Sequence, residues 1–226
     1  MPISKNDFNF LNKLEKNNDR DWFTANKEEY QTSHESLIAF ADAVLEKLNR
    51  HDVIETLNGK KSLYRIYRDV RFSKDKAPYK THWAGGYKRA TVERRGGYFF
   101  HIAPNNGSFV AGGFWAPSKE DLQRIREEIA VDDQEMRDVL ADNNFTKTFG
   151  RLVGEQLKSA PKGFAKEHKA IDLLRFKQFV FSKNFTDEEV LSPNFADKVD
   201  QTFKAMRPFF DYMSDVLTTD INGEKI

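Results

Sequence analysis

The hydrophobic pattern of this chain changes its period twice, and this change limits the fold more than any other feature. In the first fifty residues apolar side chains recur at helical spacing, for example at Leu37, Ala41, Val44 and Leu48. From about Ser62 to residue 115 they alternate instead, which is typical of β-strands, and a helical spacing then returns. This order predicts an α+β fold in which helices come before and after a sheet.

Capping and turn signals indicate where these elements begin and end. Ser4 and Asp7 have capping-box spacing, Ser118 is a candidate helix N-cap, and Asn106 with Gly107 indicates a hairpin. The expected strands are residues 62–72, 82–89, 98–103, 108–115 and 176–184. We therefore expect an antiparallel sheet of about four to six strands, flanked by N-terminal and C-terminal helices.

A single domain covering residues 1–226 is the simplest organisation for a chain of this length. It would consist of N-terminal helices over residues 1–60, a sheet core over 61–116 and a helical and mixed C-terminal part over 117–226. The sequence has no cysteine, no apolar run long enough to span a bilayer and no signal-peptide pattern at its start. We therefore expect a cytoplasmic protein without a membrane partner.

Positive charge is concentrated in one part of the chain. From Lys60 to Arg95 there are twelve Lys or Arg and three Asp or Glu, so this window carries +9 while the whole chain carries +1. The remaining residues therefore carry −8. A local excess of this size favours an anionic ligand, whereas the near-neutral total is unlike that of a strongly basic nucleic-acid-binding domain.

The candidate ligand-binding residues all lie between residues 65 and 82. They are Arg65, Arg68, Arg71, Ser73, Lys74, Lys76, Lys80 and His82. Arginine forks and mobile lysine charges together suit a phosphate. On the expected strand, Arg68 shares the apolar face with Ile66 and Val70, where a buried guanidinium needs an acidic partner or a bound anion.

Three functions fit this segment. The first is binding of a small anionic, phosphate-bearing ligand. The second is a structural or protein-interaction domain whose arginine cluster is an internal ion-pair network that fixes helices to the sheet. The third is single-stranded nucleic-acid binding, because aromatic residues such as Tyr64, Tyr67 and Phe72 interleave with the cations.

Catalytic and metal motifs give no further direction. There is no phosphate-binding P-loop, no nucleophile elbow around any serine and no metal-ligand spacing among the five histidines, so no cofactor or metal is expected. His82 and His101 fall on neighbouring expected strands, and either could transfer a proton if the anion site were an active site. Whether the protein is an enzyme stays open at this point.

The chain resembles a family of conserved hypothetical bacterial and fungal proteins, the domain of unknown function 2461. The resemblance rests on a long segment from Arg65 to His82 and on shorter matches elsewhere. The shorter matches are Asn17, Asn18, Arg20, Trp22, Phe23, Gly112, Gly113, Trp115, Arg126 and the run from Pro161 to Phe164. It extends over nearly the whole chain. The resemblance implies one compact domain and no established activity.

Overall fold

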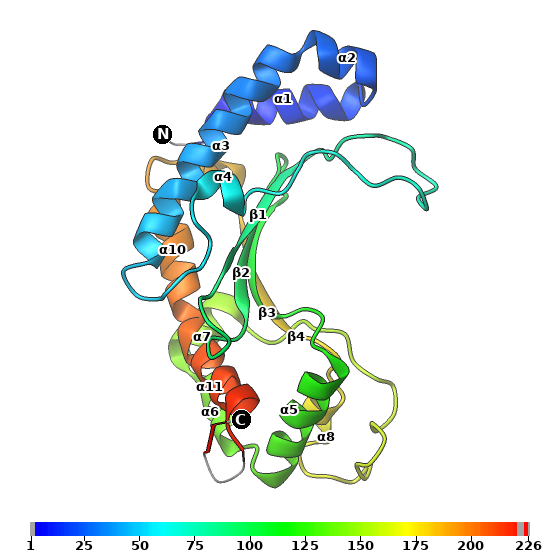
Figure 1. The fold of residues 1–226 in the computed structure, drawn as a ribbon, viewed down its shortest axis with the longest axis vertical. Coiled ribbons are helices and arrows are strands. Elements are labelled where there is room, and N and C mark those ends of the chain that lie inside the picture. The colour runs from blue at the N-terminus through cyan, green and yellow to red at the C-terminus, as the bar shows by residue number, and fades with distance from the viewer. Residues whose placement is uncertain (1–2, 221–223, 226) are drawn as a thin grey trace. The chain divides into compact units, whose positions relative to one another are not determined.

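The computed structural model describes residues 3–220 and 224–225, which form helices around one four-stranded sheet (Figure 1). The helices are α1 (Lys5–Lys16), α2 (Arg20–Ala25), α3 (Lys27–Leu48), α4 (Gly59–Ser62), α5 (Lys119–Val131), α6 (Gln134–Ala141), α7 (Asn143–Phe149), α8 (Ile171–Leu174), α9 (Asp187–Val190), α10 (Phe195–Ala205) and α11 (Arg207–Thr218). The strands are β1 (Trp83–Lys88), β2 (Gly97–Ile102), β3 (Ser108–Phe114) and β4 (Phe179–Phe185).

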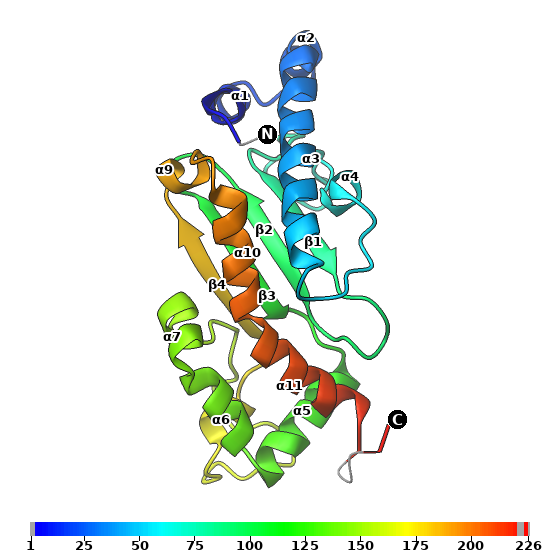
Figure 2. The ribbon, with the colours of Figure 1, turned by 90° about the vertical axis from the view of Figure 1, so that its left-hand side faces the viewer.

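The sheet is antiparallel with the order β1-β2-β3-β4, so the predicted α+β class and the number of strands are confirmed (Figure 2). The predicted hairpin joins β2 to β3. Its left-handed residues are Asn105 and Asn106, with φ of 63° and 59°, and Gly107 follows them. Asparagine tolerates this conformation better than most residues with a Cβ, which explains the paired asparagines.

The predicted helix starts are also present. Ser4 and Asp7 form a capping box at the start of α1, and the Ser118 side chain accepts a hydrogen bond from the Asp121 backbone N–H at the start of α5. These contacts satisfy N–H groups that have no partner inside the helix.

The expected strand over residues 62–72 is wrong. Only isolated bridges pair this segment, at Leu63 with Gly85 and at Tyr67 with Tyr79. Beyond Tyr67 and Tyr79 the backbone pairing ends, because side chains bind the backbone N–H and carbonyl of Ala77. The Ala77 N–H donates to the Asp75 carboxylate at 2.9 Å, and the Ala77 carbonyl accepts from Arg68 at 3.0 Å. Local side-chain contacts thus replace the strand pairing.

The chain divides into two compact units, and each strand contributes residues to both. Unit 1 comprises Met1–Tyr87, Phe99–Val110 and Asn184–Gln201. In its core Phe40 of α3 packs edge-on against Phe100 of β2 at 5.7 Å, and it stacks on Phe195 of α10 at 5.3 Å. The Tyr87 hydroxyl donates to the Ala41 carbonyl of α3 at 2.8 Å. One face of this part of the sheet is therefore covered by α3 and the start of α10.

Unit 2 comprises Lys88–Tyr98, Ala111–Lys183 and Thr202–Ile226. Its core is built on α11, where the ring of Phe210 meets Tyr98 of β2 at 5.1 Å and Phe181 of β4 at 6.2 Å. Gly113 of β3 has a φ of 120° and faces the Phe179 carbonyl so closely that a Cβ would collide with it. This position therefore requires glycine.

No helix within residues 3–220 and 224–225 has both the length and the apolar character needed to cross a bilayer.

Candidate functional site

Residues 63–82, here called the arm, form an extended loop that leaves the sheet at β1 and folds back on itself (Figure 1). Its two sides are held together by the backbone. The N–H of Tyr64 donates to Ala84, that of Lys80 to Ile66 and that of Arg68 to Pro78, all at 2.8 to 2.9 Å. Pro78 itself has no N–H to give to a ladder. The arm therefore has a paired base and a tip made of turns.

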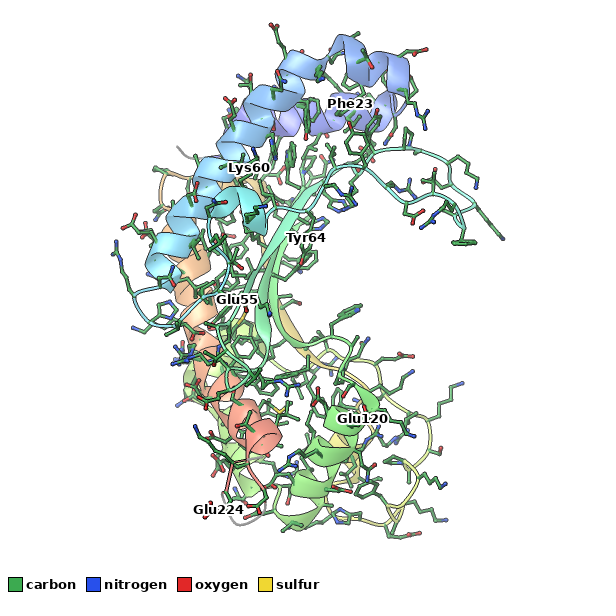
Figure 3. All side chains as sticks on the ribbon, viewed as in Figure 1. Phe23, Glu55, Lys60, Tyr64, Glu120 and Glu224 are labelled. Carbon is green, nitrogen blue, oxygen red and sulfur yellow. The ribbon has the colours of Figure 1, made fainter. Side chains whose placement is uncertain are left out.

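Asn18, at the turn before α2, anchors the base of the arm. Its side-chain amide donates to the Tyr79 carbonyl at 3.0 Å and accepts from the Tyr79 N–H at 3.1 Å. The ring of Phe23 on α2 (Figure 3) stacks on that of Tyr79, with the ring centroids 4.0 Å apart. The centroid of the Tyr67 ring lies 6.2 Å from that of Phe23. Two parts of the sequence that carry the family resemblance thus meet at this point.

Arg68 is not buried, so the prediction that it lies inside the apolar face is wrong. Its side chain is 28% exposed and pairs with Asp75 at 2.6 Å. The expected acidic partner exists, but it comes from the arm itself and not from a helix. Ile66 is buried, whereas Phe72 is 97% exposed, because the arm projects beyond the strands and has no apolar layer to cover its tip.

Three other predicted cations also contact the arm itself. Arg71 pairs with Asp69 at 2.6 Å, and this pair lowers the pKa of the carboxyl. The ammonium of Lys76 donates to the Val70 carbonyl at 3.0 Å. The ammonium of Lys80 donates to the carbonyl of Arg65 at 2.9 Å. These contacts stiffen the arm and leave its cations at the surface or partly exposed.

The side chains of Arg65, Ser73 and Lys74 make no hydrogen bond or ion pair with any residue that the structure describes. Arg65 lies at the base of the arm, while Ser73 and Lys74 lie at the tip. These three groups are therefore available to a ligand at two different places.

Beside the arm, five rings of unit 1 form a continuous row that we call the ring strip. Successive ring centroids lie 6.2 Å apart for Tyr64 and Phe99, 5.7 Å for Phe99 and Phe109, 4.8 Å for Phe109 and His101, and 4.1 Å for His101 and His82. The alternation of β2 turns Phe99 and His101 away from the helix-covered face, and both are half-buried. Tyr64 is 51% exposed and lies beside β1 (Figure 3).

The electrostatic surroundings of the ring strip are positive. Lys80 lies 6.0 Å from the centre of the Tyr64 ring. Burial, His101 and Lys80 together lower the pKa of His82 to about 4, and burial lowers the pKa of His101. Burial and Arg65 lower the pKa of Lys80. An anion placed here would raise all three pKa values, since it would favour the charged forms.

The eight predicted residues thus separate into two groups. His82 belongs to the ring strip and Lys80 adjoins it, with Arg65 next to Lys80, whereas Arg68, Arg71, Ser73, Lys74 and Lys76 lie toward the tip. His82 and His101, expected on neighbouring strands, lie with their ring centroids 4.1 Å apart. The sequence analysis did not identify Phe99 and Phe109 as site residues. The pattern that indicates them is the presence of large rings on both faces of β2 and β3.

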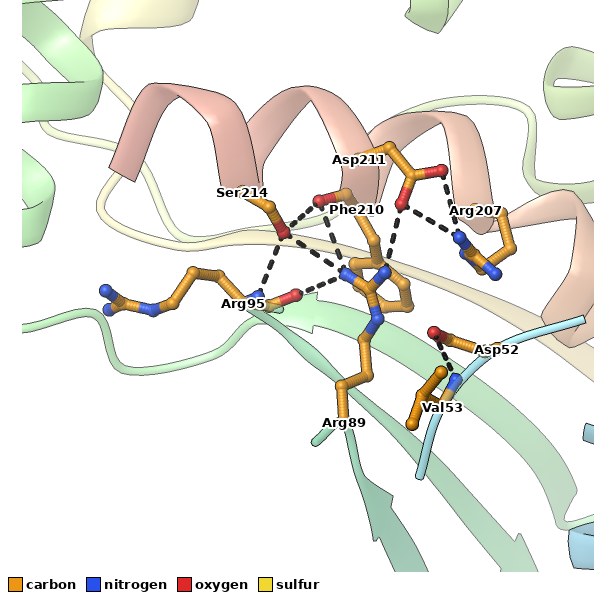
Figure 4. Close-up of polar contacts among 8 residues, drawn as sticks. All are labelled: Asp52, Val53, Arg89, Arg95, Arg207, Phe210, Asp211 and Ser214. Carbon is orange, nitrogen blue, oxygen red and sulfur yellow. Dashed lines mark hydrogen bonds and ion pairs between the residues drawn. The ribbon is translucent and has the colours of Figure 1, made fainter. Parts of the chain in front are cut away.

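Arg89, directly after β1, is more deeply buried than any of the predicted site arginines, and it lies in unit 2 (Figure 4). Its side chain is 1% exposed and pairs with Asp211 of α11 at 3.0 Å. It also donates to the Arg95 carbonyl at 2.8 Å and lies 5.3 Å from the centre of the Phe210 ring. These contacts join the chain after β1 to α11 and give Arg89 a structural role.

Among the described residues, no group of three or more His, Asp or Glu side chains is placed to hold a metal ion. No curated protein and no solved structure matches the chain. The family model of a conserved hypothetical protein, DUF2461, matches residues 6–212. This match spans both the arm and the N-terminal turn that anchors it, and the chain belongs to the DUF2461 family.

Proposed function

We propose that unit 1 binds a small ligand that carries both a phosphate and a planar ring, such as a nucleotide. The observation that carries the proposal is the ring strip with Lys80 at its edge. A base can stack on Phe99 or Phe109, and a phosphate can meet Lys80 and the neighbouring Arg65.

The depressed pKa values support an anion as the ligand. The causes that lower the pKa of Lys80 and His82 are burial and positive neighbours. A phosphate placed among them favours the charged form of each group, so the anion stabilises Lys80 as a cation. His82 and His101 are then ligand contacts, and no reaction is assigned to them.

Thermal unfolding with adenosine monophosphate, adenosine and inorganic phosphate tests the proposal. At a hundred-fold excess over Kd, a ligand that binds only the folded state raises Tm by roughly 5 to 10 °C in a protein of this size. We expect the largest shift with the nucleotide, because it uses both ring and charge. The rise in Tm caused by adenosine monophosphate should be smaller in the Phe109→Ala and Lys80→Ala variants.

Lys74→Ala is the matched control, since it removes a lysine from the tip of the arm, where it has no ion pair within the described residues. It should keep the full nucleotide shift. Equal shifts with phosphate and the nucleotide would show that the rings take no part. Absence of any shift up to millimolar nucleotide would contradict the proposal.

A structural role for the arginine cluster is the second candidate, favoured by the pairs of Arg68 with Asp75 and of Arg71 with Asp69. Both pairs stay within the arm and are partly or largely exposed, and solvent screens such pairs so that they contribute little to stability. We therefore rank it below ligand binding. We also retain a cytoplasmic location as a proposal, because a chain without cysteine suits a reducing compartment.

A further inference from the structure

The arm exposes more aromatic surface than its fold requires. Phe72 is 97% exposed, Tyr67 57% and Tyr64 51%, and all three lie within nine consecutive residues. Single exposed apolar side chains are ordinary, but three large rings on one short projection are typical of a contact surface.

Each end of the arm combines a ring with a cation. At the base, the ammonium of Lys80 lies 6.0 Å from the centre of the Tyr64 ring, and at the tip the guanidinium of Arg71 lies 5.9 Å from that of Phe72. From Tyr64 to Lys80 the arm carries six Lys or Arg and two Asp, a net charge of +4. Rings for stacking beside cations for phosphates are the two elements by which proteins hold single-stranded nucleic acid.

The two ends are too far apart for one nucleotide. The paired part of the arm from Tyr64 to Arg68 is already about 13 Å long at the rise of an extended strand. A nucleotide step advances about 3.4 Å along the axis of a DNA helix. Only a ligand of several linked nucleotides can therefore contact the ring strip and Phe72 together.

The arm is also held in shape before any ligand arrives. Asn18 binds both backbone groups of Tyr79, and Phe23 stacks on the ring of that tyrosine. Arg68 closes the loop through Asp75 and the Ala77 carbonyl. A surface fixed in this way loses less conformational entropy on binding.

We propose that unit 1 binds single-stranded nucleic acid, with one base on the ring strip and further nucleotides along the arm as far as Phe72. This inference rests on the proposed nucleotide site and extends it to a polymer. An acidic polypeptide would satisfy the charge of the arm but would leave its rings without stacking partners, so we favour nucleic acid.

The test is fluorescence anisotropy with labelled oligothymidylates from two to about sixteen nucleotides, which includes the usual single-strand site sizes of roughly 4 to 16 nucleotides. We expect affinity to rise with length and then level off once the arm is covered. Affinity for the longest strand should fall steeply as salt increases, because several phosphates release counterions.

Phe72→Ala should weaken binding of the longest strand about ten-fold, as expected for the loss of one stacked base. It should leave the binding of adenosine monophosphate unchanged, since the ring strip is intact. Phe72→Tyr should retain the affinity, because the ring remains. Leu57→Ala removes another apolar side chain of unit 1 that is 81% exposed, and as the matched control it should have no effect.

Three results would overturn the inference. If the mononucleotide binds but affinity does not rise with length, the arm does not hold a polymer and the nucleotide site alone stands. If Phe72→Ala, shown by circular dichroism to be folded, binds the longest strand as well as the parent protein, stacking at the tip is refuted. If polyglutamate of matched charge competes as well as the oligonucleotide, the arm is a site for acidic polypeptides. Failure of mononucleotide binding would instead refute the proposed function itself.

Discussion

Arg89 in unit 2 and Arg68 in the arm of unit 1 are both paired with an aspartate, yet their surroundings differ. Arg89 is 1% exposed in its side chain, and its aspartate partner lies on a helix 122 residues away in the sequence. Arg68 is 28% exposed, and its partner lies seven residues away. The first arginine joins distant parts of a core, whereas the second shapes a surface projection. Charge clusters in one sequence can therefore have opposite roles, and burial distinguishes them.

Replacing Arg89 by Ala should have the largest effect on stability. The change leaves a cavity and removes hydrogen bonds to the Arg95 carbonyl and to α11. Loss of a buried charged group with several partners costs about 3 kcal/mol, so Tm should fall by roughly 10 °C. Urea unfolding measures the difference. Arg89→Lys retains the charge without the planar fork, so its urea midpoint should lie between those of the parent protein and Arg89→Ala. An unchanged midpoint in Arg89→Ala would mean that the contacts of Arg89 do not stabilise unit 2.

Acidification should lower the stability of the folded protein by an intermediate amount, because of His82 in the ring strip. The pKa of His82 is about 4 in the folded protein and near 6.5 in the unfolded chain. Between these values the unfolded chain binds a proton that the folded protein does not, so stability is complete above pH 6.5 and is lost as pH falls toward 4. The half-exposed ring limits this loss to about 1 to 2 kcal/mol.

Urea unfolding between pH 7 and 4 measures this dependence, with His82→Asn as the test variant. Its stability should change less with pH than that of the parent protein. His168→Asn changes a histidine of unit 2 and serves as the control, which should keep the parental slope. Equal slopes in all three proteins would remove His82 from the acid response.

Arg71→Ala should have the smallest effect on stability. The pair with Asp69 is 77% and 61% exposed in its two side chains, and solvent screens such pairs so that they contribute little to stability. Thermal unfolding of this variant should coincide with that of the parent protein within about 2 °C. A loss as large as that of Arg89→Ala would contradict the distinction between surface and core arginines.

Local pattern was enough to predict most of the secondary structure. The helical period, the capping box at Ser4 and the Asn106–Gly107 pair depend on neighbours in sequence, and the structure has the helices and the hairpin that they indicate. The strand over residues 62–72 failed because alternation alone does not reveal whether a covering layer exists. The contact of Asn18 with Tyr79 spans 61 positions, and no periodicity encodes such a pair.

The candidate site was predicted only in part, because sequence pattern does not encode contacts between distant residues. Charge and composition pointed to the arm, and His82 and His101 were expected on neighbouring strands; their rings lie 4.1 Å apart. The partners of the cations depended on where the chain turns at the tip, which decided that Arg68 meets Asp75 and not a helix. Phe99 and Phe109 were not among the predicted site residues, because an alternating pattern does not say which face of a strand stays open, and both lie on the face away from the covering helices.

The anchor of the arm has a consequence for how relatives of this chain can vary. Asn18 bonds only to the backbone of residue 79, so these hydrogen bonds do not depend on the side chain there. The ring stack with Phe23 does depend on it. Position 79 should therefore accept any flat aromatic residue across the family, while position 18 should admit almost no replacement. A change at position 18 would leave two backbone groups without partners, whatever residue stands at position 79.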